Sequence, residues 1–283
     1  MAQDPEQTIT YREALRLGLR DALHSRPDTF LMGEDVGRYG GAFGVSRGLL
    51  EEFGPDRIMD MPLSEAGFTG VAIGAAMAGL RPIVEIMTVN FSLLALDQLF
   101  NQAATLSHMT AGQVCVPLVV RMSCGIGRQL AAQHSHSWEV FFAHVPGLKV
   151  VTIGTIGDAR HILAQALKEP GPVIILEYTS LLNIEGRPCD SIQPFGSAVV
   201  MKPGKDITLI GIGTTVPKTL EAAGLLKAVG LEAEVINLRS LRPLDSDTIY
   251  NSVRKTHRVL IAEDGCCLVY TSDAADDTPC VDL

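Results

Sequence analysis

The sequence predicts an α/β protein with two units, a larger one built on a parallel β-sheet and a smaller one that follows it. Short apolar runs typical of buried strands alternate with segments of helical periodicity along most of the chain. Residues 178–204 show neither period and supply turn residues, so we expect the boundary between the units there. The chain has 283 residues, 47% of them hydrophobic, which is enough to build two cores.

Charge and cysteine content exclude several classes of function. The formal net charge is -9 and the basic residues are scattered, which argues against a nucleic-acid partner. The 6 cysteines lack CxxC spacing and indicate the reduced thiols of a cytoplasmic protein. The N-terminus has no export or organelle signal, and the uncharged apolar run at residues 66–80 is shorter than the roughly 20 apolar residues that cross a membrane. We therefore predict a cytoplasmic protein with no nucleic-acid and no membrane partner.

In the first unit, Thr10 and Glu13 have the spacing of a capping box and predict a helix that ends near residue 25. The further expected strands are residues 29–32, 57–61, 82–87, 117–121, 148–152 and 173–177, and the further expected helices are residues 65–80, 93–107 and 158–167. Asn90 or Ser92 is expected to cap the helix at residues 93–107. Apolar strands of this kind predict a parallel sheet that is covered on both faces.

The second unit repeats the alternation on a smaller scale. Its expected strands are residues 206–211, 234–238 and 258–262, and its expected helices are residues 215–230 and 246–255. The first of these helices should be capped by Thr214 or Thr215, with Pro217 in its first turn and Gly230 at its end. We therefore expect a second α/β unit that is smaller and incomplete.

The helix expected at residues 65–80 has almost no side-chain bulk along one stripe. The small residues Ala66, Gly70, Gly74 and Ala78 recur every fourth position, so another backbone can approach that stripe closely. Glycine inside a helix costs roughly 0.5–1 kcal/mol relative to alanine, and close packing is the compensation we expect. Glu65 heads this helix, where it either stabilises the helix dipole or serves a functional site, and spacing alone leaves both open.

Other motifs point to chemistry only weakly. GIGTTV at residues 211–216 follows a strand and opens a helix, but it lacks the third glycine and the acidic residue of a dinucleotide-binding fingerprint. His134 and His136 lie two residues apart with no cysteine nearby, which is not the spacing of a metal site. No GxSxG motif marks a hydrolase nucleophile. On sequence alone, His134 is either an ordinary histidine or a functional one.

Five separated motifs carry a resemblance that covers both units. They are PLSEAGFTGVAIGAAMAGLRP at residues 62–82, EIMTVNF at 85–91, AAQHS at 131–135, PGLKVV at 146–151 and LRSLRPLD at 238–245. In these residues the chain resembles the β subunit of the E1 component of 2-oxoacid dehydrogenase complexes, and within that family it looks most like the pyruvate dehydrogenase members. The resemblance runs from about Ile9 to Asp264. Residues 178–194 follow the family pattern only loosely.

The resemblance implies a transketolase-like fold that binds thiamin diphosphate. It assigns residues 1–185 to a pyrimidine-binding domain and residues 196–264 to a partial transketolase C-terminal domain. Residues 265–283 lie beyond the resemblance and show no apolar periodicity, so we expect them to be a non-native tail.

The resemblance also implies a set of site residues. Glu65 matches the residue that contacts N1′ of the aminopyrimidine and shares a proton with it, so that the 4′-imino group can take the proton from C2 of the thiazolium. Phe91 matches the aromatic residue that stacks on the pyrimidine, while Met87 lines the same pocket and Leu63 lies beside the cofactor. His134 matches the active-site histidine, with a role at the acyl intermediate or in lipoyl transfer.

The cofactor cannot be held by this chain alone, because the sequence has no GDG motif for Mg²⁺ and the diphosphate. The resemblance implies that an E1 α subunit supplies that motif, in an α2β2 assembly that takes a 2-oxoacid substrate and passes the acyl group to the E2 lipoyl acyltransferase. A K⁺ ion bound by backbone oxygens is also implied, at Leu118, Ala166, Leu167, Glu169 and Gly171. The alternatives are an acetoin or branched-chain 2-oxoacid dehydrogenase subunit, a non-catalytic assembly subunit and an NAD-binding oxidoreductase.

Overall fold

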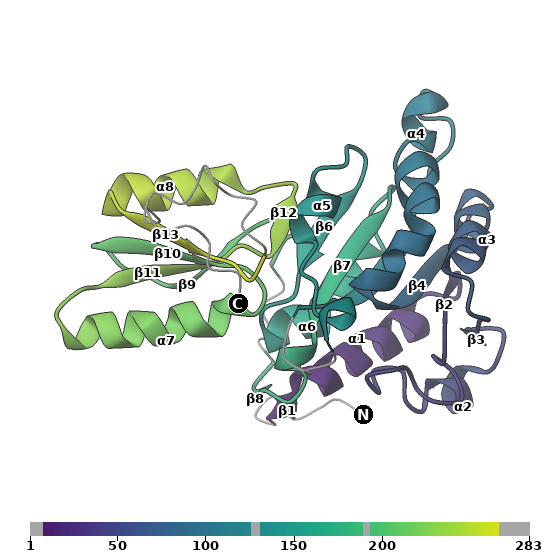
Figure 1. Ribbon diagram of the computed structural model, residues 1–283, viewed down its shortest axis with the longest axis horizontal. Helices are drawn as coiled ribbons and strands as arrows, with labels where there is room; N and C mark the ends of the chain where they lie inside the picture. The colour runs from purple at the N-terminus through teal and green to yellow at the C-terminus, as the bar shows by residue number, and fades with distance from the viewer. Residues whose placement is uncertain (1–7, 126–130, 189–192, 266–283) are drawn as a thin grey trace.

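The computed structural model describes residues 8–125, 131–188 and 193–265, whose two larger sheets lie side by side along the long axis of the molecule, with a further two-stranded sheet (Figure 1). Of the predicted tail, residues 266–283 lie outside the described residues. Within the described ranges, no helix has both the length and the apolar character needed to cross a membrane.

The larger sheet has seven strands among the described residues, in the order β12-β6-β7-β5-β4-β2-β3. The strands are β2 (Thr29–Gly33), β3 (Ile58–Asp60), β4 (Arg81–Thr88), β5 (Val119–Cys124), β6 (Lys149–Thr152), β7 (Val173–Tyr178) and β12 (Ser240–Arg242). All neighbours pair in parallel except β12, which runs antiparallel to β6. The six parallel strands confirm the predicted sheet.

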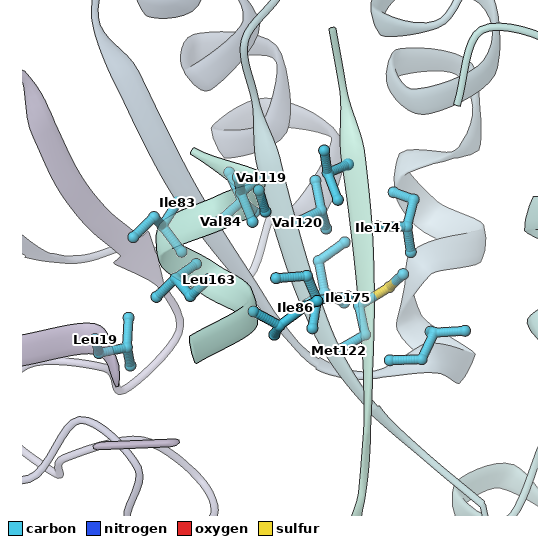
Figure 2. Packing of buried hydrophobic residues seen from close by; sticks show 14 of the residues in the cluster. Leu19, Ile83, Val84, Ile86, Val119, Val120, Met122, Leu163, Ile174 and Ile175 are labelled. Carbon is cyan, nitrogen blue, oxygen red and sulfur yellow. The ribbon is translucent and has the colours of Figure 1, made fainter. Parts of the chain in front are cut away.

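Helices α1 (Tyr11–Ser25) and α6 (Ile156–Ala166) pack against each other, and α3 (Glu65–Met77) packs on β2 and β4. Thr10 caps α1 as predicted, because its Oγ1 accepts a hydrogen bond from the Glu13 amide at 3.1 Å. Figure 2 shows Leu19 of α1 and Leu163 of α6 beside the apolar side chains of the central strands. Both leucines are buried, so these two helices close the core over the sheet.

The smaller sheet has the order β13-β10-β11-β9. Its strands are β9 (Val199–Lys202), β10 (Ile207–Gly211), β11 (Ala233–Asn237) and β13 (Val259–Ala262), and only β9 is antiparallel to its neighbour. Helices α7 (Thr215–Ala228) and α8 (Ser246–Thr256) cover opposite faces of this sheet (Figure 1). The three predicted strands and two predicted helices are confirmed.

The helix predicted at residues 93–107 is wrong as a single α-helix. The chain instead forms a 3₁₀ segment η1 (Val89–Ala95), a π segment η2 (Asp97–Ala103) and the short helix α4 (Leu106–Met109). Neither predicted cap forms, because the Asn90 amide bonds to the His136 ring and the Ser92 hydroxyl donates to the carbonyl of Val89 at 2.5 Å. The side chains that were expected to start a regular helix are therefore used in other contacts.

Several short elements were not predicted, because segments this short show no clear periodicity in the sequence. They are β1 (Ile9–Thr10), which pairs with β8 (Glu185–Gly186), the helices α2 (Leu49–Phe53) and α5 (Glu139–Ala143), and the 3₁₀ turns η3 (Ala132–His134) and η4 (Thr179–Leu181). The strands β9 and β12 were also missed. Elements of two to five residues are set by their long-range neighbours and not by local pattern.

The small-residue stripe of α3 stays open. A Cβ built on Gly74 would meet no described heavy atom within 4 Å, and one built on Gly70 would meet only the Gln98 side chain at 3.9 Å. The helix also ends at Met77, before Leu80 where the prediction ended it. The close helix contact predicted for this stripe is therefore not made among the described residues of this chain.

Candidate functional site

The predicted site residues gather at the carboxyl edge of the seven-stranded sheet. Glu34 directly follows β2, Glu65 follows β3, Phe91 follows β4 and His134 follows β5. These four strands are neighbours and run in parallel, so their carboxyl ends meet at one edge. Ligands of open α/β sheets bind at this edge.

Glu65 is the first residue of α3, as predicted, and is only 6% exposed. The positive end of the helix dipole favours a carboxylate at this position. The side chain makes no hydrogen bond or ion pair with any other residue that the structure describes. A buried carboxylate with no donor beside it is costly unless a ligand or a proton satisfies it.

Glu34 is a second buried carboxyl group beside Glu65, and the sequence analysis missed it. It is 7% exposed, and its Oε1 has no partner among the described residues. Burial, together with the negative charges of Glu65 and Asp35, raises its pKa to about 7. The signal available in the sequence was its place directly after a buried strand, at the edge where Glu65 was also expected. A raised pKa of this origin is typical of functional sites.

Phe91 and His134 are brought into contact although they lie far apart in the chain. Their rings are 5.6 Å apart in an edge-on arrangement with an interplanar angle of 79°. The neighbouring His136 is held by the Asn90 side chain and stacks on Trp138 at 4.9 Å. The structure therefore places both predicted residues, Phe91 and His134, on one side of the site.

The two remaining cofactor contacts, Met87 and Leu63, are less enclosed. Met87 lies near the end of β4 and is partly exposed. Leu63 is 86% exposed, although it is a large apolar side chain two residues before Glu65. The described residues of this chain therefore leave the predicted contact Leu63 open to solvent.

The carbonyls predicted to bind K⁺ are already occupied in part. Arg81 Nη1 donates to the carbonyls of Leu167 and Glu169 at 2.6 and 2.9 Å. The carbonyl of Leu118 accepts from the Val173 amide at 2.9 Å, and that of Ala166 accepts from the Glu169 amide at 3.1 Å. A carbonyl oxygen can accept a second interaction, but the guanidinium brings a positive charge to the place where the cation was expected.

The glycines of GIGTTV are explained by packing. A Cβ built on Gly211 would lie 2.8 Å from Oγ1 of Thr219, and one built on Gly213 would overlap the ring of Tyr178. The motif borders a cavity of about 310 Å³ between α6 and α7, lined by Val216 and Pro217. Because close contacts account for both glycines, the motif gives no support to a dinucleotide site.

A separate group of buried charges lies inside the sheet. Arg121 on β5 donates through Nε and Nη2 to Glu177 on β7 at 2.7 and 2.6 Å, and through Nη1 to Glu85 on β4. All three side chains are at most 8% exposed. Burial raises the pKa of Glu85, while Arg121 acts against that shift. This group crosses three neighbouring strands and ties them together.

Comparison with known proteins identifies both domains. The family model described as "Transketolase, pyrimidine binding domain" matches residues 7–185, and the one described as "Transketolase, C-terminal domain" matches residues 196–269. The chain is 46% identical to pyruvate dehydrogenase E1 component subunit beta-1, mitochondrial, of Oryza sativa subsp. japonica, over 91% of this chain and 70% of the relative. The chain belongs to the family of pyruvate dehydrogenase E1 component β subunits.

Other members of this E1 β-subunit family match equally well. The mitochondrial β subunit of Drosophila melanogaster is 46% identical over 91% of this chain and 72% of its own length, and the β subunit of Rickettsia felis is 42% identical over 91% and 79%. A solved structure titled "Split gene transketolase, inactive beta4 tetramer" has a TM-score of 0.76 at 24% identity, covering 91% of this chain and 80% of that one, and shows the same fold. The predicted family and the transketolase-like fold are confirmed.

Proposed function

We propose that this E1 β-family chain works with an α subunit to decarboxylate pyruvate oxidatively and to pass the acyl group to the lipoyl group of E2. The observation that carries the proposal is the buried pair of Glu34 and Glu65, which has no donor from the described part of this chain and lies at the edge that also holds Phe91 and His134. Relatives that are 42–46% identical bear the pyruvate dehydrogenase name, which supports pyruvate over acetoin or a branched-chain 2-oxoacid.

The residues present fit the aminopyrimidine half of thiamin diphosphate. The orphaned Oε1 of Glu34 and the unpaired carboxylate of Glu65 offer acceptors to the donor edge of such a ring, and the partly buried Phe91 offers a face for stacking. Met87 and Leu63 would complete the apolar surround. When bound, thiamin diphosphate supplies the nucleophilic carbon for the 2-oxoacid carbonyl. We assign Mg²⁺ and the diphosphate to the α subunit, because this chain has no GDG motif.

Glu34, next to Glu65, would hold a proton near the pyrimidine ring. With a pKa of about 7, Glu34 is partly protonated at neutral pH, whereas an ordinary glutamic acid is ionised. Glu34 can therefore hold a proton next to Glu65, and we assign the contact with N1′ of the pyrimidine to Glu65. His134, whose ring contacts Phe91, would then act on the acyl group or during lipoyl transfer.

The exposed apolar surface around α3 supports a partner subunit. Leu63, Val71 and Met77 are 86%, 57% and 49% exposed, and they flank the open stripe at Gly70 and Gly74. We assign this surface to an α2β2 assembly in the cytoplasm. The domain limits 1–185 and 196–264, and a non-native tail at 265–283, stay predictions.

Replacing the acid tests the proposal most directly. Glu65→Gln keeps the size of the side chain, so the complex with the α subunit should assemble while the rate of 2-oxoacid decarboxylation falls by about 10²- to 10⁴-fold. The matched control is Glu51→Gln, which removes another carboxylate from the first turn of a helix and should leave the rate unchanged. A rate within about threefold of wild type would reduce Glu65 to a helix-stabilising carboxylate.

A binding measurement tests the divided site. By calorimetry with Mg²⁺ present, the purified chain should bind thiamin diphosphate negligibly and gain affinity when the α subunit is added. Micromolar binding by the chain alone would contradict the assignment of the diphosphate to α.

We also propose the K⁺ site at the carbonyls of Leu118, Ala166, Leu167, Glu169 and Gly171. Because Arg81 already bonds two of these oxygens, K⁺ would have to share them with a guanidinium. Thermal melts in KCl and in NaCl at equal ionic strength decide the matter, since only a bound ion stabilises the folded chain specifically. Equal melting temperatures in the two salts would show that this chain binds no K⁺ at these carbonyls.

A further inference from the structure

The phenol of Tyr178 and the carboxylate of Glu139 form a buried contact at the end of the segment that contains the predicted active-site histidine. Tyr178 ends β7 and is 1% exposed, and its hydroxyl donates to Oε1 of Glu139 at 2.8 Å. The thiol of Cys124, at the end of β5, lies 3.8 Å from the same oxygen. Glu139 is 8% exposed and begins α5, directly after residues 131–138, which we call the histidine segment because they contain His134 and His136.

Tyr178 also contacts the chain on the other side of that segment. A Cβ built on Gly125, the residue after β5, would lie 3.2 Å from Cδ1 of Tyr178, so only glycine fits comfortably against the ring. The Gly125 amide donates to the carbonyl of His136 at 2.9 Å. The ring of Tyr178 therefore supports a backbone bond to the histidine segment, while its hydroxyl holds the residue at which that segment ends.

Other atoms of the same ring meet the C-terminal domain, at Gly213. Gly213 lies between β10 and α7 at φ +54, and a Cβ there would overlap the ring of Tyr178. The backbone of this turn can lie against the ring only because residue 213 has no side chain. The ring thus contacts both Gly125 of the first domain and Gly213 of the second.

Within the histidine segment, His136 is bound by the Asn90 side chain and stacks on Trp138, whereas His134 has fewer contacts. The ring of His134 touches Phe91, but its side chain makes no hydrogen bond to the residues that the structure describes. Ala131 has φ 65 and ψ 178, a backbone conformation that is nearly restricted to glycine and persists only when the surroundings enforce it. The position of His134 therefore depends on its contact with Phe91 and on how the rest of the segment is held.

We propose that Tyr178 and Glu139 are positioning residues, a buried clamp that fixes the histidine segment against the sheet and ties it to the C-terminal domain. The inference deepens the proposed function and rests on it for the role of His134. A phenol and a carboxylate that are both removed from water hold each other strongly, because either one alone would be left unsatisfied. Loss of the hydroxyl should loosen the segment without displacing the ring.

Amide hydrogen exchange of the full chain tests the clamp without any cofactor or partner. In Tyr178→Phe, the Gly125 amide and the amides of residues 131–142 should exchange about tenfold faster, while those of β2 stay unchanged. Glu139→Leu should give the same pattern. Glu139→Gln keeps an acceptor for the phenol and should remain within about threefold of wild type.

Thr208→Val is the control. Thr208 is also buried, and its hydroxyl bonds with those of Ser252 and Thr256 at 2.7 Å inside the C-terminal domain, so a buried hydroxyl is lost away from the histidine segment. Unchanged exchange of the histidine segment in Tyr178→Phe, or an equal rise in Thr208→Val, would overturn the clamp. If Tyr178→Phe does not fold, Glu139→Leu tests the same contact from its other side.

A second measurement separates this inference from the proposed function. In a complex rebuilt with the α subunit, Tyr178→Phe should lower the rate of acyl transfer and leave the affinity for thiamin diphosphate unchanged. Faster exchange with an unchanged acyl-transfer rate would keep the clamp and remove His134 from the reaction. Unchanged exchange with normal function of the wild-type complex would remove the clamp alone.

Discussion

The interior of the seven-stranded sheet and its carboxyl edge both bury acidic side chains, but they treat them in opposite ways. Inside the sheet, Glu85 and Glu177 share Arg121, and bonds at 2.6–2.7 Å join Glu177 to the guanidinium. At the edge, Glu34 and Glu65 are as deeply buried, at 7% and 6% exposure, with no cation from the described chain. The first pair has its partner in the fold, whereas the second pair lacks one.

The difference separates stability from function. A buried carboxylate with an internal partner contributes to the fold, and removing that partner leaves a buried charge without a counter-charge. A buried carboxylate with none destabilises the isolated chain, and it is tolerated where a ligand or proton supplies what is missing. The edge of the sheet is therefore where this chain should lose least stability, and most activity, when a carboxyl group is changed.

The largest effect on stability should come from the interior. Arg121→Met leaves Glu85 and Glu177 buried without a cation, so the free energy of unfolding should fall by about 3–5 kcal/mol. Chemical denaturation measures the change. The control Arg16→Met breaks the surface pair with Glu13, whose members are 26% and 36% exposed, and should cost about 1 kcal/mol or less. Equal losses of unfolding free energy in the two variants would show that the buried ion pairs of Arg121 contribute no more stability than the surface pair of Arg16.

At the carboxyl edge we expect a smaller effect on stability, and a gain instead of a loss, when Glu34 is replaced. Because the folded chain raises the pKa of Glu34 to about 7, it keeps a proton that the unfolded chain loses near the usual value of 4.5. The stability contributed by Glu34 is thus present below pH 4.5 and is lost as the pH rises to 7.

In Glu34→Gln, which cannot ionise, this pH dependence should vanish, and the variant should be more stable than wild type at about pH 8. Melting temperatures at about pH 5, 6, 7 and 8 test this expectation. Glu221→Gln, at an exposed position on α7, should keep the wild-type slope. A wild-type slope in Glu34→Gln would mean that other groups cause it.

The smallest effect should appear at the open stripe of α3. Gly74→Ala adds a methyl group where no described atom lies within 4 Å, so the isolated chain should gain about 0.5–1 kcal/mol from better helix propensity. Association with the α subunit should weaken, because the methyl group fills the close-approach surface. Gly224→Ala on α7 has equally open surroundings and should give the same gain with no effect on association. If Gly74→Ala associates with the α subunit as well as the wild-type chain does, the subunit contact does not lie on this stripe.

Much of the fold could be predicted from the sequence because its signal is local. The strands around Ile83, Val120 and Ile174 are mainly apolar runs, and Thr10 marks the start of α1 through a hydrogen bond to a residue only three positions further along the chain. The break in the helix expected at residues 93–107 could not be foreseen. It depends on the bond from Asn90 to His136, which lies 46 residues further along the chain.

The residues of the candidate site also divide into those that the local sequence revealed and those that only the fold brings together. Glu65 was found because it heads a helix of small residues, and His134 was found through the AAQHS resemblance. Glu34 was missed because a glutamate in a glycine-rich loop has no local mark, and its pKa is raised only once the fold buries it and brings it near Glu65. The clamp at Tyr178 was equally invisible, since its partners Glu139 and Gly213 lie far from it in the chain.

The sequence by itself determined the family, the α/β alternation and which carboxylate heads the bare helix, because each follows from neighbouring residues. The tertiary structure alone decided which charges are paired. Arg121 meets Glu85 and Glu177 only because parallel strands align side chains across the sheet, and Glu34 meets Glu65 only because those strands end together. Burial and charge act through space over a few ångströms, and only the folded chain sets those distances.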